Sequence, residues 1–414
     1  MAHTDIKDLG WRVTFAGLGI NLALGILYTW SVISKGIPDA WNWTESDKSL
    51  PYAVACLVFS LVMVPAGRLQ DKLGPRLVAT FGGLMVGAGM IIASTTTSPM
   101  AFMVGFGILA GAGIGFGYAS ATPPAVKWFP AAKTGMIAGI VVSGFGLASV
   151  YAAPLAKWLN ATYGTQRMVL VLGILFLFVV VVLSQFLKAP PAGYVPKGAA
   201  PPAPGAGAVG SKKEDFTPKE MLCTVQFYLL WFMYACGAGA GLMIIAKLAA
   251  IAKQQAGIEL GFILVAVLAV GNGAGRIAAG MLSDKLGRKP TMFLCFVSQA
   301  VLILLLSRTS EGNALAAVPV LALISALVGA NYGANLSLFP SITKDFYGLK
   351  NFGVNYGLVF TAWGVGGFML AKLAGRMYDL HDTFAYAYYG AVALLVLAAF
   401  VTFLVKPPHH QVEA

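Results

Sequence analysis

The sequence predicts an all-α membrane protein of twelve transmembrane helices, arranged as two similar six-helix halves. Two observations support this fold class. The chain of 414 residues is 58% hydrophobic and only 11% charged, whereas soluble domains carry about 25% charged residues. In addition, one glycine-containing charged motif occurs twice, about half the chain apart, which indicates an internal duplication.

Twelve apolar stretches are long enough to cross the hydrocarbon core of a bilayer as helices. They lie near residues 11–36, 49–67, 77–97, 101–123, 135–156, 167–187, 227–250, 260–282, 290–307, 313–339, 353–374 and 384–405. The polar start of the chain lacks a cleavable signal pattern, so we expect the first stretch to stay in the protein. The expected parts are an N-terminal bundle, a flexible linker, a C-terminal bundle and a tail, at 1–187, 188–220, 221–406 and 407–414.

The linker is expected to be flexible because it is rich in proline, glycine and alanine and has no apolar periodicity. The net charge of +12 fits the excess of lysine and arginine that membrane proteins carry on the cytoplasmic side. We therefore expect both termini to be cytoplasmic, the protein to lie in the inner cell membrane, and no nucleic-acid partner.

Metal, cofactor and enzyme functions are not expected. The four cysteines lack CxxC spacing, and the four histidines lie outside the predicted spans. A membrane enzyme such as an acyl or glycosyl transferase would need catalytic histidines or acidic clusters at the membrane, and the sequence has none. A sensor is another alternative, but no signalling domain is attached to the predicted bundles, and no obligate protein partner is evident.

The repeated motif reads G-x-x-x-D-K-L-G and follows the second and the eighth predicted spans. Asp71 and Asp284 differ by 213 residues, and every matched position has the same offset. The glycines allow tight turns at the membrane surface, and the acids can accept from helix N-termini and cations. We expect these residues to control conformation rather than bind substrate; they are Gly67, Asp71, Gly74 and Arg76, and Gly280, Asp284, Gly287 and Arg288.

Arg276 is the most informative single residue. Among 28 Lys and Arg and 16 Asp and Glu residues, it alone is expected well inside an apolar span. A cation at this depth usually faces a cavity with an anionic partner, and no acid lies mid-span. Asn272 is four residues earlier on the same helix face. An arginine fork plus an amide can hold one carboxylate, so the missing anion is expected to be the substrate; snorkelling to the surface is the alternative.

Aromatic residues inside the spans are further candidate ligands. A tyrosine hydroxyl can bond a small polar ligand while its ring closes an apolar pocket, although most membrane tyrosines serve packing or the interface. The candidates are Tyr28 with Leu27 beside it, Tyr118, Tyr332 and Trp363. Glycines recur in spans 4, 5 and 11; they serve close helix packing or, alternatively, sliding of gating helices.

The repeated motif resembles the loop signature of the major facilitator superfamily, and the resemblance covers the whole chain. More finely, five segments resemble the monocarboxylate transporters and the oxalate/formate antiporters: Gly10-Trp11, Tyr28-Thr-Trp30, Trp128-Phe129-Pro130, Asn272-Gly-Ala-Gly-Arg276 and Leu338-Phe339-Pro340. The resemblance implies alternating access between the halves and a carboxylate-binding role for Arg276. It thus implies a secondary transporter for a small monocarboxylate such as L-lactate or pyruvate, with proton symport.

The sequence departs from those families in ways that bear on the substrate. Asn272 stands where the mammalian monocarboxylate transporters have an aspartate implicated in proton coupling, and Val32 near where they have a lysine. Trp363 stands where the oxalate antiporters have a second cation. One cation fits one carboxylate, which favours monocarboxylates. An oxalate/formate-type exchanger remains the alternative, with Lys372 as a possible second cation.

Overall fold

The computed structural model is a bundle of long helices without strands in its described part. It describes residues 8–130, 133–191, 194, 196, 215–348 and 351–408. In the first half the elements are α1 (Gly10–Leu24), η1 (Gly25–Thr29), α2 (Trp30–Lys35), η2 (Asp39–Trp41), α3 (Glu45–Leu73), α4 (Pro75–Ser94), α5 (Pro99–Phe102), η3 (Met103–Ala110), α6 (Gly111–Val126) and α7 (Thr134–Ser184).

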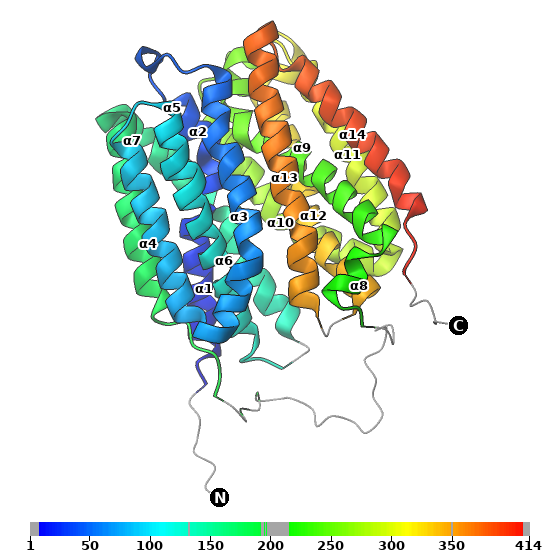
Figure 1. Cartoon of the computed structure of the whole chain (residues 1–414). Coiled ribbons are helices and arrows are strands. Elements are labelled where there is room, and N and C mark those ends of the chain that lie inside the picture. The colour runs from blue at the N-terminus through cyan, green and yellow to red at the C-terminus, as the bar shows by residue number, and fades with distance from the viewer. Residues whose placement is uncertain are drawn as a thin grey trace, which may run out of the picture.

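The second half is built in the same way. Its elements are α8 (Pro218–Leu222), α9 (Val225–Ala256), α10 (Gly261–Leu286), α11 (Arg288–Ser307), η5 (Ala314–Ala316), α12 (Val318–Tyr347), α13 (Phe352–His381) and α14 (Ala385–Leu404). Figure 1 shows the two halves side by side, the first in blue to teal and the second in green to red.

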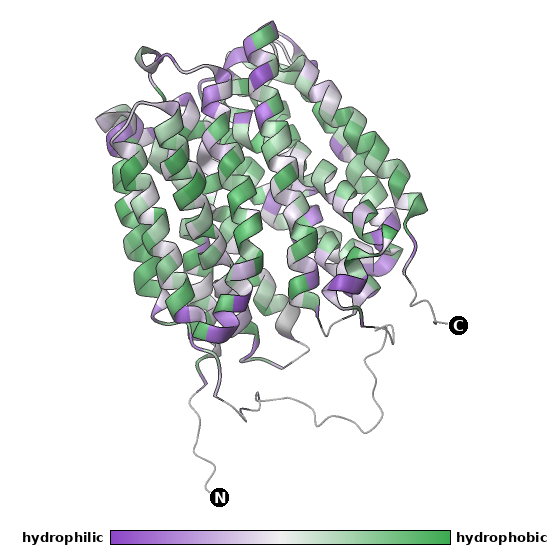
Figure 2. Cartoon of the chain, viewed as in Figure 1, coloured by the Kyte–Doolittle hydropathy of each residue, from purple (hydrophilic) through white to green (hydrophobic). Residues whose placement is uncertain are grey.

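The predicted twelve spans agree with the helices. Eleven helical stretches among the described residues are long and apolar enough to cross a membrane. One of them, α7, carries two spans, because Gly164 has a non-helical backbone with φ 79° and ψ 168° inside it. Many large hydrophobic residues are exposed on the bundle, and Figure 2 shows hydrophilic residues gathered at its two ends, as a bilayer requires.

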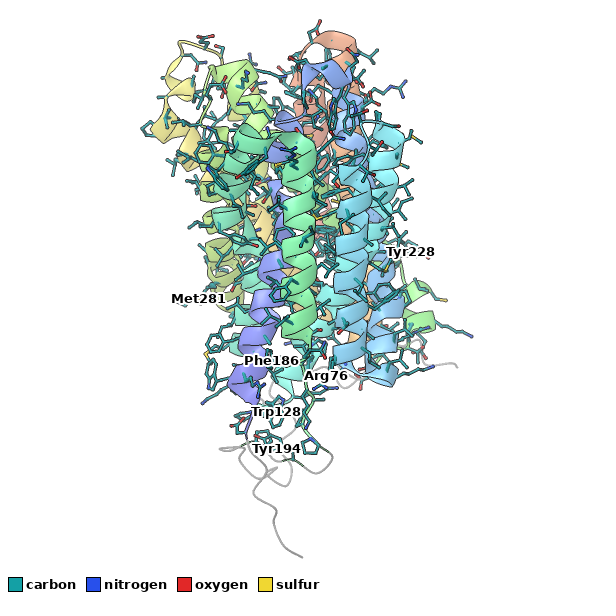
Figure 3. All side chains as sticks on the ribbon, turned by 90° about the vertical axis from the view of Figure 1, so that its left-hand side faces the viewer. Arg76, Trp128, Phe186, Tyr194, Tyr228 and Met281 are labelled. Atoms are coloured by element: carbon teal, nitrogen blue, oxygen red, sulfur yellow. The ribbon has the colours of Figure 1, made fainter. Side chains whose placement is uncertain are left out.

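The bundle has two distinct ends. We call the end where α1 begins and α14 ends the termini side, and the opposite end the far side (Figure 1). On the termini side, Figure 3 shows Trp128 and Tyr194 close together. The indole of Trp128 donates to the Lys188 carbonyl at 2.7 Å, and its ring lies 4.8 Å from that of Tyr194. The start of the predicted linker is thus fastened under the first half. Most of the linker and the last part of the tail lie outside the described residues. The final residues of the predicted linker already belong to α8.

The two copies of the repeated motif make the same turn. Gly74 has φ 86° and ψ 156°, and Gly287 has φ 93° and ψ 159°. A side chain disfavours this left-handed region, so a glycine ends α3 and α10 at equivalent places. The duplication inferred from sequence is therefore visible in backbone conformation.

Close contact between the halves is concentrated towards the far side, along α3 and α13. A Cβ at Gly364 would collide with Ser60 Oγ, one at Gly367 would lie 3.2 Å from Cys56 Cβ, and one at Gly375 would lie 2.6 Å from the Glu45 carbonyl. Towards the termini side, Gly357 would only touch Val64 and Gly353 meets nothing within 4 Å. The two helices therefore diverge towards the termini side.

The glycines of span 4 serve packing within the first half. Gly111 lies against the backbone of Ala55 in α3, and Gly113 against Gly82 in α4. Of the two roles considered for the glycines, packing explains span 4, whereas the glycines of span 11 at 364 and 367 face the opposite half.

Candidate functional site

Arg276 lies in α10 and reaches across to the other half. Its Nε donates to Asn272 Oδ1 at 3.1 Å, and its Nη1 donates to the Val142 carbonyl of α7 at 3.1 Å. Both acceptors are neutral, and in the described part of the chain no acidic side chain pairs with the guanidinium. Asn272 is fully buried, and its Nδ2 has no partner there. The site therefore offers a cation and an amide donor without an anion.

The glycines around Arg276 serve close packing. Gly273 faces Leu147 of α7, and Gly271 and Gly275 pack against the backbone of α12. They let α10 and α12 approach closely, which fixes the base of the arginine side chain. Room for its tip comes from Gly146 of α7, where a Cβ would lie 3.3 Å from Arg276 Nη2.

Three of the predicted aromatic ligands form one connected layer between the halves. The hydroxyls of Tyr28 and Tyr332 share a short hydrogen bond across the halves, and the indole of Trp363 donates to the Tyr332 hydroxyl at 2.8 Å. Tyr28 can point inward because the chain changes from α1 to the 3-10 turn η1 at this level. Tyr118 belongs to the same region, since its ring lies 5.3 Å from Phe145, which also contacts Tyr28.

These aromatic residues enclose a small recess in the centre of the bundle. Its cavity volume is only about 10 Å³, which is room for about one water molecule and far below the roughly 300–1,000 Å³ of pockets that hold drug-sized ligands. The recess is lined by Tyr28, Phe59, Tyr118, Phe145, Leu336, Phe360 and Trp363. This lining is apolar except for the polar atoms of Tyr28, Tyr118 and Trp363, and neither Arg276 nor Asn272 is part of it.

Some site residues were missed from sequence and some were placed elsewhere. Phe59, Phe145, Leu336 and Phe360 were missed, because apolar side chains in apolar helices carry no signal of their own. Leu27 is buried beside Tyr28 but does not line the recess. Lys372 is exposed, with its ammonium 5.6 Å from the Phe368 ring. It therefore supplies no second cation to the recess.

Lys247, near the end of the predicted seventh span, is a second cation that is buried inside the bundle. It is 2% exposed in α9, and its Nζ lies 2.7 Å from Glu45 Oε2 of the other half. A lysine near a span end can snorkel to the surface, so the sequence gives no sign of this partner. The bundle thus holds two internal cations, of which one has an acidic partner.

The repeated motif differs between the halves in its polar contacts. In the second half Arg288 pairs with Asp284 at 2.7 Å and with Asp345 of α12 at 3.0 Å. In the first half, Asp71 and Arg76 show no ion pair with another described residue. The role of both copies in conformational control stays a prediction.

Comparisons with known proteins agree with this geometry. The family model described as Major Facilitator Superfamily matches residues 13–267 and 242–414. The MFS-type transporter YhjX of Escherichia coli is 26% identical over 370 residues, covering 88% of each chain. The oxalate:formate antiporter of Oxalobacter formigenes is 27% identical over 82% of this chain and 77% of its own. Monocarboxylate transporter 13 of Rattus norvegicus is 25% identical over 99% of this chain and 92% of its own.

A solved structure has the same fold. It is that of a bacterial homologue of the human lysosomal transporter Spinster, in an inward-facing and occupied conformation. It superposes with a TM-score of 0.71 at 15% identity, covering 96% of this chain and 97% of its own. The chain therefore belongs to the major facilitator superfamily, whose members are membrane transporters and not enzymes.

Proposed function

We propose that this transporter is a secondary carrier for a short monocarboxylate of the lactate or pyruvate class. The observation that carries the proposal is the unpaired Arg276 beside the buried, unpartnered Nδ2 of Asn272. A substrate carboxylate would take a bidentate bond from the guanidinium and a further bond from the amide. Its short carbon body would then lie against the aromatic recess that Tyr28, Tyr118 and Trp363 help to line.

The proposed substrate also provides a reason why substrate binding would be coupled to the conformational change of the carrier. An uncompensated cation inside a low-dielectric bundle is costly, so the empty carrier would change conformation poorly, and a bound carboxylate would remove this cost. A proton that travels on the substrate, a nearby hydroxyl or a water would make the step electroneutral. We propose proton symport on this basis, because no carboxylate lies near Arg276 among the described residues.

The membrane orientation follows from charge. Lysines and arginines are more frequent in the segments on the termini side than in those on the far side. By the positive-inside rule we propose that the termini side is cytoplasmic and that the protein lies in the inner cell membrane. The structure, in which α3 and α13 meet near the far side, would then be closed to the outside.

Uptake into proteoliposomes tests the proposal. Radiolabelled L-lactate, pyruvate, formate and oxalate are offered with and without a pH gradient, acid outside. We expect uptake of lactate or pyruvate that a pH gradient accelerates. Uptake that is indifferent to the gradient would reject symport, and the absence of any carboxylate uptake would reject the substrate class.

An anion exchanger is the second candidate, because one relative is named an oxalate:formate antiporter. An exchanger would require substrate inside the vesicle and no proton gradient, so counterflow measured in the same vesicles separates the two. Oxalate carries two carboxylates, and Lys372 lies away from the recess. We therefore place exchange of a dicarboxylate second.

A further inference from the structure

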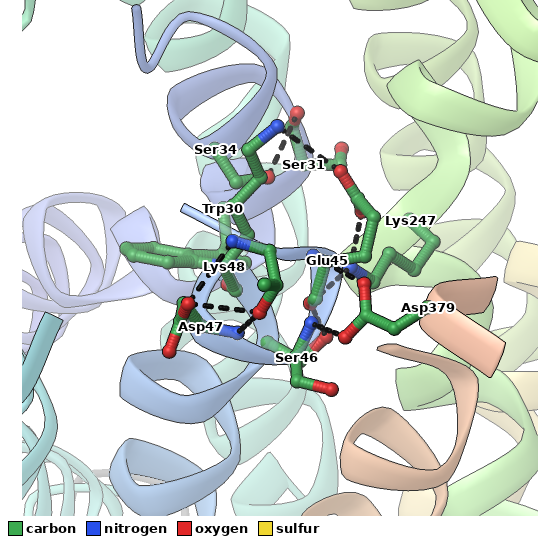
Figure 4. A network of polar contacts seen from close by, with 11 residues as sticks. Trp30, Ser31, Ser34, Glu45, Ser46, Asp47, Lys48, Lys247 and Asp379 are labelled. Atoms are coloured by element: carbon green, nitrogen blue, oxygen red, sulfur yellow. Dashed lines mark hydrogen bonds and ion pairs between the residues drawn. The ribbon is translucent and has the colours of Figure 1, made fainter. Parts of the chain in front are cut away.

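The far side holds the one ion pair in the described chain whose two members are both buried. Glu45 is 9% exposed and Lys247 is 2% exposed. Lys247 Nζ donates to the Glu45 carboxylate at 2.7 Å and to the Glu45 backbone carbonyl at 3.1 Å (Figure 4). Since Glu45 begins α3 and Lys247 lies in α9, the pair joins the two halves.

A second carboxylate joins the halves in the opposite direction. Asp379, in the last turns of α13, accepts from the backbone N–H of Glu45 at 2.7 Å and of Ser46 at 2.8 Å (Figure 4). These N–H groups at the start of α3 have no acceptor within their own helix, and the helix dipole favours an anion there. Each half therefore gives one carboxylate to the other and receives one.

The internal duplication adds a related pair. Lys35 of α2 binds Glu259, in the segment between α9 and α10, at 3.0 Å. Lys247 minus Lys35 is 212 residues, and Glu259 minus Glu45 is 214, close to the 213 of the repeated motif. In each half a lysine near the end of the first span thus binds the glutamate before or at the second span of the other half. The two ion pairs are therefore equivalent contacts, with the lysine in the first half in one pair and in the second half in the other.

The sites of these contacts indicate what they control. The inter-half hydrogen bonds and ion pairs that the described chain shows lie at the central site or on the far side. Further along α3 from Glu45, the Tyr52 hydroxyl donates to the Leu242 carbonyl at 3.2 Å, and Cys56 lies against Gly367. In a carrier that alternates between two open states, these contacts must separate when the far side opens.

We propose that Glu45, Lys247 and Asp379 form the far-side gate of this transporter, with Lys35–Glu259 as its weaker, solvent-exposed copy. The inference rests on rocking of the two halves and not on the identity of the substrate. Glu45 acts on Lys247 as a tethered carboxylate, which is the chemistry we propose for a free substrate on Arg276. Loss of the Glu45 charge leaves Lys247 inside the interface without an anion and favours the far-side-open state.

Cys56 provides a native reporter for this gate. It is fully buried, about 16 Å of helix from Glu45 at 1.5 Å per residue, and it lies in the interface that must part. The remaining cysteines, Cys223, Cys236 and Cys295, are replaced by serine. The rate at which a water-soluble maleimide labels Cys56 in nanodiscs then reports far-side opening without any transport measurement.

In this background we expect Glu45→Gln to raise the Cys56 labelling rate at least tenfold. Asp47→Asn is the matched control, because Asp47 lies two residues away and binds only Thr44 of its own half; its rate should stay within twofold. Glu259→Gln should give a smaller increase than Glu45→Gln. A rate for Glu45→Gln that equals that of the Asp47→Asn control would overturn the gate.

The charge swap and chemical rescue keep the test decisive if a single variant folds poorly. Glu45→Lys combined with Lys247→Glu should restore slow labelling, because the pair is rebuilt with its charges exchanged. Acetate should slow the labelling of Cys56 in Glu45→Ala by supplying a free carboxylate to Lys247. The same should hold when Arg276→Gln is added, because that change removes the proposed substrate site. If neither the swap nor acetate slows labelling, Lys247 does not hold a carboxylate and the gate as proposed is wrong.

Discussion

Arg276 and Lys247 are both cations inside the same bundle, yet they have opposite partners. Arg276 bonds a neutral amide and a neutral carbonyl, whereas Lys247 bonds a carboxylate that the protein supplies from its other half. Both residues connect the two halves, so rocking of the halves would affect both. We therefore propose that Lys247, with its internal anion, stabilises one conformation, and that Arg276, without one, receives its anion from a ligand.

Removal of the Arg276 charge should give the largest effect. We expect Arg276→Ala to reduce carboxylate uptake into proteoliposomes by a factor of roughly 30 to 5,000, as loss of a buried charge partner costs about 2–5 kcal/mol. Arg276→Lys keeps the charge but not the planar fork and should retain partial uptake. Uptake by Arg276→Ala at the unchanged rate would show that the carboxylate binds elsewhere.

Removal of Lys247 should instead act first on stability. Lys247→Met leaves Glu45 with Lys48, at 3.1 Å, as its remaining partner, so the loss should stay below the roughly 3–5 kcal/mol that breaking an isolated buried pair costs. The double variant Glu45→Gln with Lys247→Met carries no buried charge and should recover most of that loss. Thermal unfolding in the same detergent measures both. Equal stabilities of the single and double variants would mean that the pair carries little energy in this structure.

The sequence could predict the fold and the unpaired cation because both follow from the order of residues along the chain. Apolar length, the 213-residue repeat and a single arginine inside a span need no tertiary information. The aromatic layer was predicted in part, since hydroxyls and an indole stand out in apolar helices. Phe59 and Phe360 do not stand out, because the helix face that looks inward depends on packing.

The partner of Lys247 was beyond the sequence for a related reason. Glu45 precedes the predicted second span, and Lys247 lies near the predicted end of the seventh, where charged residues are ordinary. The two are 202 residues apart, so only the tertiary fold brings them together. The repeat nevertheless carries the pattern, since Lys35 and Glu259 occupy nearly equivalent positions and are paired as well.

A direct way to sharpen the comparison is to give Arg276 an internal anion. In Asn272→Asp the new carboxylate would replace the Oδ1 that already lies 3.1 Å from Arg276 Nε. Arg276 would then resemble Lys247, and we expect roughly tenfold weaker carboxylate binding at neutral pH. Acidification should restore uptake as the new carboxyl is protonated. Asn272→Ser, which adds no charge, is the control. Unchanged substrate affinity in Asn272→Asp would show that substrate binding does not depend on Arg276 lacking an internal anion.

The smallest expected effect concerns the exposed copy of the gate. Hydrogen bonds from Lys35 and Lys253 hold the pKa of Glu259 below its usual 4.5. Because this pKa is lowered in the folded protein, the contribution of Glu259 to stability is present above the unfolded value and is lost only as the pH falls through the lowered one. Glu259 is largely exposed, so the contribution is modest.

Comparison of the wild-type protein with Glu259→Gln across pH tests this last point. The difference in thermal stability should be constant from about pH 8 to about pH 5 and should be lost only at lower pH, as the pH falls through the lowered pKa of Glu259. A difference that already disappears between about pH 7 and pH 6 would contradict the lowered pKa. Such a result would mean that Glu259 takes up a proton in the physiological pH range, whereas Lys35 and Lys253 lower its pKa.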